Sequence, residues 1–182
     1  GGRVVTPLIF LASEDELRHA LNDSGAVGVV TTVEFLPKVS AVMKVGGGTP
    51  DVRFVLVPGV GSAAGAAPGV PVLDFDEVAS AEPGSIADRS GTDLAALLYT
   101  GGTTGRSKGV PLTHAGLYWC GSAAHEQSVP SNVSSSVLPL PLAHAYGVLV
   151  ICGGMHRTDH TRTILMRWFD PAGWVKLAAE HK

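Results

Sequence analysis

The segment YTGGTTGRSKG, from Tyr99 to Gly109, constrains the fold of this chain more than any other. It follows the apolar run Leu94 to Leu98, which is typical of a buried strand, so the chain leaves a sheet and turns at this point. Its glycines let backbone N–H groups approach an anion, while the Thr and Ser hydroxyls and Lys108 add donors and a positive charge. The composition predicts a loop that holds phosphate groups, and the alternative is a plain turn.

The spacing of this segment excludes two common phosphate-binding loops. A P-loop needs Gly-Lys-Ser/Thr running directly into a helix, whereas here Ser107 precedes Lys108 and Pro111 interrupts the chain. The dinucleotide-binding pattern fails because Thr103 stands where its second glycine would be. The segment is therefore a phosphate loop of another kind.

Position by position, the segment resembles the signature loop of the adenylate-forming superfamily of acyl-CoA synthetases, aryl-CoA ligases, luciferases and peptide-synthetase adenylation domains. The usual form is Tyr-Thr-Ser-Gly-Thr-Thr-Gly-x-Pro-Lys-Gly, and the departures are Gly101 for Ser and Ser107 for Pro. The resemblance implies that Lys108 is catalytic and balances charge on the departing pyrophosphate. The ATP phosphate-binding residues that it implies are Thr100, Gly101, Gly102, Thr103, Thr104, Gly105 and Lys108.

A second motif, VLPLPLAHAYG, lies between Val137 and Gly147. Its prolines take an apolar strand out of the core in extended form, and His144 then stands at the start of an apolar helical run, where free N–H groups favour an anion. The motif resembles the next motif of the same superfamily. That resemblance implies an acyl pocket lined by His144, Tyr146 and Gly147, with His144 at the carboxylate end and catalytic. The alternatives are a capping or core histidine and ordinary packing of Tyr146.

Apolar runs alternate with helical patterns along the chain, which predicts an α/β fold with a mostly parallel sheet and flanking helices. The predicted strands are 26–32, 52–57, 94–98, 134–138 and 163–166, and the predicted helices are 13–24, 34–45, 74–79, 113–127, 148–155 and 170–182. The first helix begins at a Ser13–Glu16 capping box and has Leu17, Ala20 and Leu21 on one face, and Asp170 with Pro171 begins the last helix. The Gly/Ala-rich residues 59–69 are expected to form a loop. The resemblance implies an incomplete portion of the large N-terminal domain of an adenylate-forming enzyme. We expect a single partial domain over 1–182, with leading βα units in 1–92 and the phosphate loop, the His144 motif and the following units in 93–182.

Composition narrows the partners and the compartment. The net charge of −3 and the lack of Lys/Arg blocks argue against nucleic-acid binding. The longest apolar stretch, near Gly147 to Met155, is too short to be a transmembrane segment, and the first residues do not form a signal peptide. Cys120 and Cys152 both lie in apolar surroundings, which favours reduced thiols and a cytoplasmic location.

His156, Asp159 and His160 lie close together in sequence, as metal ligands can. The segment lacks the central Glu of a zinc-protease helix, and Arg157 and Arg162 would repel a cation. We therefore expect no metal site there.

The resemblance implies an AMP-forming acid–CoA ligase that uses ATP, Mg2+ and coenzyme A on a small-molecule carboxylic acid. Relatives that activate amino acids carry an Asp shortly after the second motif. Residues 144–149 contain no acid, so a fatty or aryl acid is expected.

Whole superfamily members are more than twice as long as this chain, and their later motifs are absent here. We therefore expect a fragment that is inactive alone, and a homodimer that covers the cut sheet. Two alternatives stay open. One is a non-catalytic relic or interaction module of the same fold, and the other is an unrelated phosphate-binding hydrolase.

Overall fold

The computed structural model describes residues 2–44, 51–60, 69–101, 106–128, 134–158 and 160–181. The chain divides into two compact units. The first unit comprises Gly1–Arg89 and Leu97–Val110, and the second unit comprises Ser90–Ala96 and Pro111–Lys182.

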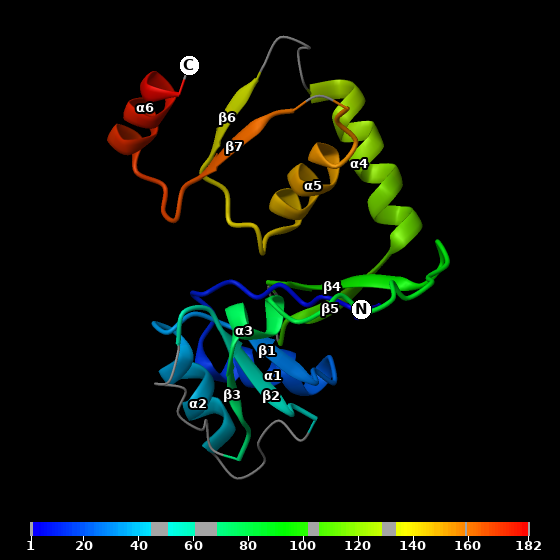
Figure 1. The fold of residues 1–182 in the computed structure, drawn as a ribbon, viewed down its shortest axis with the longest axis vertical. Helices are drawn as coiled ribbons and strands as arrows, with labels where there is room; N and C mark the ends of the chain where they lie inside the picture. The colour runs from blue at the N-terminus through cyan, green and yellow to red at the C-terminus, as the bar shows by residue number, and fades with distance from the viewer. Residues whose placement is uncertain are drawn as a thin grey trace. The chain divides into compact units, whose positions relative to one another are not determined.

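The first unit contains a parallel sheet with helices around it (Figure 1). Its elements are α1 (Glu14–Asp23), β1 (Gly28–Val30), α2 (Leu36–Lys44), β2 (Phe54–Val57), β3 (Val72–Asp74) and α3 (Phe75–Ala79). The strands pair in the order β1-β2-β3, with Gly28 opposite Phe54 and Val55 opposite Val72. This parallel pairing confirms the fold class that the strand–helix alternation predicted.

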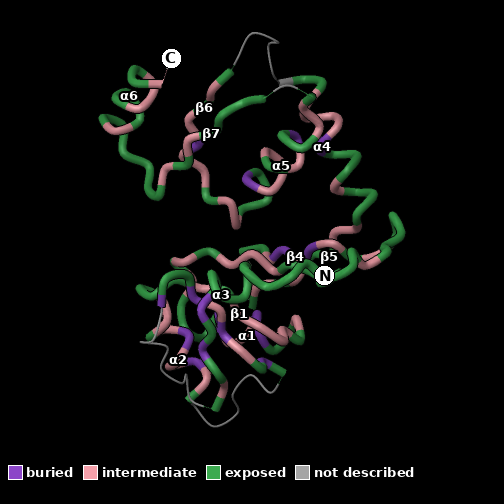
Figure 2. The backbone as a smooth tube through the Cα atoms, viewed as in Figure 1, coloured by how far each residue is buried: buried purple, intermediate pink, exposed green. Residues whose placement is uncertain are grey.

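A branched aliphatic core holds the first unit together. Val42, Val55 and Val57 are fully buried, and buried segments gather in α2 and the strands beside it (Figure 2). The cluster consists of Leu17, Leu21, Val39, Val42, Val55, Val57, Val60 and Val72. Each such side chain contributes about 1.5–3 kcal/mol on burial, so this core fixes the helices on the sheet.

Helix α1 begins at a capping box that the sequence predicted. The Ser13 hydroxyl accepts from the Glu16 N–H at 3.2 Å, and the Glu16 carboxylate accepts from the Ser13 N–H at 2.7 Å. These bonds hold the pKa of Glu16 below its ordinary value. The predicted apolar face, Leu17, Ala20 and Leu21, is buried, so the opposite face of α1 is left for polar contacts.

Strands β4 (Leu94–Thr100) and β5 (Lys108–Thr113) pair with each other and flank the predicted phosphate loop. Ala96 and Leu98 of β4 are buried, as the apolar run predicted. The sequence did not predict β5, because Gly109 and Pro111 disfavour a strand. Pro111 is tolerated because, among the described strands, β5 pairs with β4 alone and one of its edges needs no donor.

The described part of the second unit contains a smaller sheet and three helices. Its elements are α4 (His114–Ser128), β6 (Ser135–Leu138), α5 (Ala145–Gly154), β7 (Arg162–Leu165) and α6 (Pro171–Glu180). Strands β6 and β7 run parallel, with Ser135 opposite Arg162. Helices α4 and α5 approach closely at Gly121, where an added Cβ would lie 2.8 Å from the Cys152 carbonyl oxygen. Gly121 therefore allows α4 to pack closely on α5.

The described strands form three small sheets. The sequence missed β3 as well as β5, and it made the first strand longer than the observed Gly28–Val30. The expected loop at 59–69 lies largely outside the described residues. The division of the chain at residue 92 stays a prediction.

Candidate functional site

The residues expected to bind phosphate sit at the two ends of a loop in the first unit. Thr100 ends β4 and Lys108 begins β5, and both are exposed. The Thr100 hydroxyl lies 3.5 Å from the Lys108 carbonyl oxygen, at the outer limit of a hydrogen bond. The structure thus brings Thr100 and Lys108 together. The predicted residues Gly102, Thr103, Thr104 and Gly105 lie outside the described residues.

Tyr99, one residue before Thr100, contacts the polar side of α1. Its hydroxyl donates to the Asp23 carboxylate at 2.7 Å and lies 3.3 Å from the Ala20 carbonyl oxygen. Partial burial, followed by the hydrogen bond and negative charge of Asp23, raises the pKa of Tyr99 to about 12. The phenol therefore stays protonated and donating across the physiological range.

Ser107, one residue before Lys108, contacts the same helix. The His19 Nε2 atom lies 2.8 Å from the Ser107 carbonyl oxygen. A carbonyl oxygen only accepts, so Nε2 carries the proton in this contact. The His19 ring also meets the Tyr99 ring edge-on, with centroids 6.0 Å apart.

His144 caps α5 in the second unit. Its Nδ1 accepts from the Tyr146 N–H at 3.2 Å, and its backbone N–H donates to the Pro141 carbonyl at 3.0 Å. In the neutral imidazole the proton is therefore on Nε2. The capping alternative is thus seen in the structure, and His144 is exposed.

Gly147 is buried in the first turn of the same helix. An added Cβ would strike the Pro141 carbonyl oxygen and would lie 2.7 Å from the Leu142 Cα. Glycine is therefore required where the incoming segment crosses the start of α5. Its observed role is close packing, which keeps the Pro141 turn against the helix.

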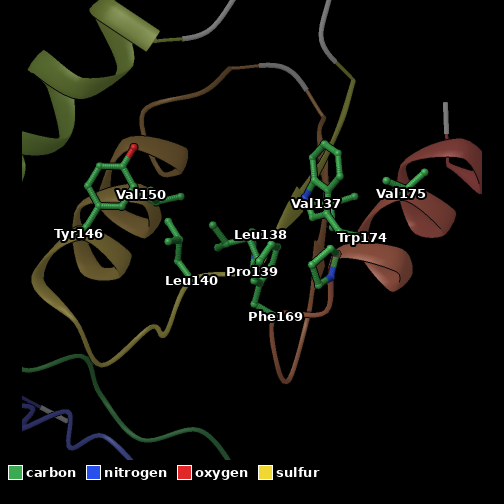
Figure 3. Close-up of a pocket in the computed structure, with 10 residues that line it drawn as sticks. Val137, Leu138, Pro139, Leu140, Tyr146, Val150, Phe169, Trp174 and Val175 are labelled. Atoms are coloured by element: carbon green, nitrogen blue, oxygen red, sulfur yellow. The ribbon is translucent and has the colours of Figure 1, made fainter.

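Two cavities adjoin Tyr146, which is 56% exposed. One, of about 630 Å3, is apolar; its lining comes from α5, from β6 and the residues after it, and from α6 and the residue Phe169 (Figure 3). The other, of about 420 Å3, lies among α4, α5, β6 and β7 and includes His125 and Thr163. Tyr146 thus lies beside both cavities, and its assignment to an acyl pocket stays a prediction.

Sequence reasoning missed His19 and Asp23. Because they lie four residues apart on α1, the sequence alone places them on one face of the helix. The sequence does not show which residues contact that face, because Tyr99 and Ser107 are about 80 residues away along the chain.

The metal-ligating residues, the two cysteines and the membrane-spanning segments were also considered from the sequence. The parts of the chain that the structure describes hold no group of three or more His, Cys, Asp and Glu side chains placed to bind a metal, and Asp159 is outside them. Cys120 and Cys152 are free thiols, and burial raises the pKa of Cys152. None of the described helices combines the length and apolarity needed to cross a membrane.

Comparison with protein families gives a match over nearly the whole chain. The family model described as AMP-binding enzyme matches residues 2–182. The chain is 33% identical over all 182 residues to a feruloyl-CoA synthase of Amycolatopsis sp, covering 32% of that protein. It is 30% identical over 161 residues to the long-chain-fatty-acid–CoA ligase FadD15 of Mycobacterium bovis, covering 85% of this chain and 26% of the relative. The chain thus spans about a third or less of the length of these curated relatives.

Solved structures of other proteins share the fold of this chain. A fatty acyl CoA synthetase of Mycobacterium tuberculosis superposes with a TM-score of 0.75 at 21% identity, covering 96% of this chain and 31% of that one. The N-terminal domain of FACL13 from the same organism superposes with a TM-score of 0.74 at 22% identity, covering 96% of this chain and 40% of that one. The ATP-bound MatB of Rhodopseudomonas palustris gives a TM-score of 0.71 at 25% identity, covering 97% and 32%. The partial α/β domain predicted from the sequence is confirmed.

Proposed function

The chain belongs to the family of AMP-binding enzymes, and on that premise we propose that it is part of an ATP-dependent ligase that activates a carboxylic acid. The observation that carries the proposal is the Tyr99–Gly109 motif at the end of β4, in a chain that matches the family over residues 2–182. The acid is fatty or aryl, in keeping with the long-chain-fatty-acid and feruloyl relatives.

In the proposed reaction the substrate carboxylate attacks the α-phosphorus of ATP, pyrophosphate leaves, and an acyl-adenylate forms. The thiol of coenzyme A then displaces AMP and gives a thioester. This chemistry asks the protein for positioning and charge stabilisation. The exposed Lys108 ammonium suits the charge that develops on pyrophosphate, and the Thr100 hydroxyl and the Gly101 N–H suit its oxygens.

On the acid side, we assign His144 Nε2–H to the carboxylate and Tyr146 to the wall of the acyl pocket. The cap bond to Tyr146 N supports this, because it fixes the tautomer in which Nε2 donates. The apolar cavity beside Tyr146 suits an aliphatic chain or a ring. Gly147 contributes by allowing the turn at Pro141 to close on the helix.

Magnesium enters the proposal from the family alone. The described residues offer no cluster of three acidic or other metal-ligating side chains, so we assign the ion no ligand in this chain. Coenzyme A enters in the same way, as the thiol acceptor.

The deciding experiment is carboxylate-dependent exchange between ATP and labelled pyrophosphate in the full-length gene product, with ferulate and a long-chain fatty acid as separate arms. We expect exchange with one arm and its loss in Lys108→Ala. No exchange with any fatty or aryl acid would favour a non-catalytic relic. ATP hydrolysis without acid would favour a hydrolase. We expect no exchange from the 182-residue chain alone.

We also propose that the chain is cytoplasmic and self-associates through apolar surface on its second unit. Large apolar side chains of this unit are exposed, Trp119 at 72% and Phe169 at 64% among them, and a second copy of the chain would cover them. Sedimentation of the chain tests this, and a clean monomer at high concentration would contradict it.

A further inference from the structure

Helix α1 is fixed rigidly within the first unit. Its apolar face, Leu17, Ala20 and Leu21, is buried, and Leu17 and Leu21 belong to the core cluster over the β1–β3 sheet. The capping box at Ser13 closes its first turn. A helix held in this way can act as a support for whatever its other face contacts.

That other face contacts the residue before each of two predicted phosphate-binding residues. Asp23 accepts the Tyr99 hydroxyl at 2.7 Å, and Tyr99 is followed directly by Thr100. His19 donates to the Ser107 carbonyl at 2.8 Å, and Ser107 is followed directly by Lys108. The two strand ends thus have one common support.

The contacts are also coupled to each other. The His19 ring lies edge-on to the Tyr99 ring, so one side chain touches both strand ends. The Thr100 hydroxyl at the end of β4 approaches the Lys108 carbonyl oxygen at the start of β5. All these atoms belong to the first unit.

We propose that His19 and Asp23 are positioning residues for polyphosphate binding, which hold Thr100 and Lys108 through Tyr99 and Ser107. We call His19, Asp23 and their two partners the α1 anchor. The inference rests on the proposed function, because it assumes that Thr100 and Lys108 meet phosphate. Anchored strand ends lose less conformational freedom on binding, and affinity rises accordingly.

The variants are chosen to separate this positioning from folding. His19→Phe removes the donor to Ser107 and keeps a ring against Tyr99, whereas His19→Gln restores a side-chain N–H donor. Tyr99→Phe removes only the hydroxyl that meets Asp23. The control is Asn22→Ala, because Asn22 is an exposed neighbour on the same helix.

The experiment measures binding of inorganic tripolyphosphate to the 182-residue chain by titration calorimetry, with the melting temperature of each variant alongside. We expect His19→Phe and Tyr99→Phe to bind about three- to tenfold more weakly, as loss of one hydrogen bond allows. His19→Gln should recover most of the affinity, and Asn22→Ala should bind like the parent chain. If His19 had a purely structural role, its variants would have lower melting temperatures, and His19→Gln would not recover tripolyphosphate affinity.

The measurements distinguish failure of the phosphate-loop assignment from failure of the α1 anchor. If the parent chain and Lys108→Ala do not differ in tripolyphosphate binding, the phosphate-loop assignment fails and the α1 anchor fails with it. If Lys108→Ala loses binding while His19→Phe and Tyr99→Phe keep it, the anchor alone is wrong. Should His19→Phe fail to fold, Tyr99→Phe decides the matter.

Discussion

The two units of the chain stabilise their folds in different ways. The first unit buries a contiguous cluster of Leu and Val side chains over a parallel sheet, with three valines fully buried. In the second unit the large side chains are mostly exposed, Trp119 at 72% and Trp168 at 50% among them. Its order relies on close helix contact at Gly121 and on the caps at His144 and Asp170.

The residues proposed to bind phosphate belong to the first unit, and the residues proposed to bind the acid belong to the second unit. The strand ends expected to hold phosphate rest on a helix that the core of the first unit fixes. Of the residues expected to meet the acid, Tyr146 lines the apolar cavity and is 56% exposed, whereas His144 caps α5 and Gly147 packs against the Pro141 turn. We therefore expect phosphate binding to fail when the core beneath α1 is cut. The acid side depends on backbone fit.

The largest expected effect is that of Leu21→Ala in the first unit. Leu21 is 5% exposed in the core, so its truncation should lower the free energy of unfolding by about 2–5 kcal/mol. The matched control is Leu165→Ala in the second unit, where Leu165 is 58% exposed, and there the loss should stay below about 0.5 kcal/mol. Denaturant unfolding followed by circular dichroism measures both. Equal losses would mean that the two units do not differ in their cores.

How much of the fold can be predicted from the sequence depends on how far apart along the chain the interacting residues lie. The Ser13–Glu16 capping box and the Leu17/Leu21 face are local patterns, and α1 was predicted from them within two residues. The cap at Asp170 with Pro171 likewise predicted the start of α6. Local chemistry was sufficient for these two helix starts, whereas α5 begins at Ala145, three residues before the predicted start.

The elements that were missed depend on distant partners. Strand β3 has three residues and exists because Val72 to Asp74 pair with β2. Strand β5 contains a glycine and a proline, and its pairing with β4 overrides those propensities. The contact between His19 and Ser107 joins residues 88 positions apart, so no local pattern contains it.

The second prediction concerns the helix contact of the second unit. In Gly121→Ala the new methyl would lie 2.8 Å from the Cys152 carbonyl oxygen, so α4 and α5 must separate. We expect a loss of about 1–3 kcal/mol in the free energy of unfolding. Gly154→Ala is the control, since nothing lies within 4 Å of its added Cβ, and it should be neutral or stabilising. A neutral Gly121→Ala would show that the second unit does not depend on this approach.

The third prediction tests the contact between Tyr99 and Asp23 in the first unit. The chain has three tyrosines, so the double variant Tyr118→Phe, Tyr146→Phe leaves Tyr99 alone to be titrated by its absorbance at alkaline pH. Its midpoint should lie at about 12. Asp23→Asn in the same background should lower the pKa, because the negative charge that opposes ionisation is removed.

The same shift predicts how stability depends on pH. The folded pKa of about 12 exceeds the ordinary value of 10.0, so the folded state holds the proton more tightly. The stabilisation from this group is therefore complete below pH 10.0 and is lost as the pH rises from there to about 12. In Asp23→Asn the free energy of unfolding should fall less between pH 10.0 and about 12 than in the parent chain. An unchanged profile would mean that Asp23 does not contact the phenol.

The smallest expected change separates the two roles of His144 in the second unit. His144→Ala removes the side-chain cap on Tyr146 N and should cost about 1 kcal/mol of unfolding free energy. His144→Asn keeps a cap, because asparagine is a favoured N-cap residue, and its stability should match the parent chain. In the full-length gene product, exchange measures the other role. If the imidazole Nε2–H meets the substrate carboxylate, Asn raises the KM for the acid and leaves the KM for ATP unchanged. If Asn restores both stability and acid affinity, His144 is a cap alone, and the acid side of the site has to be assigned to other residues.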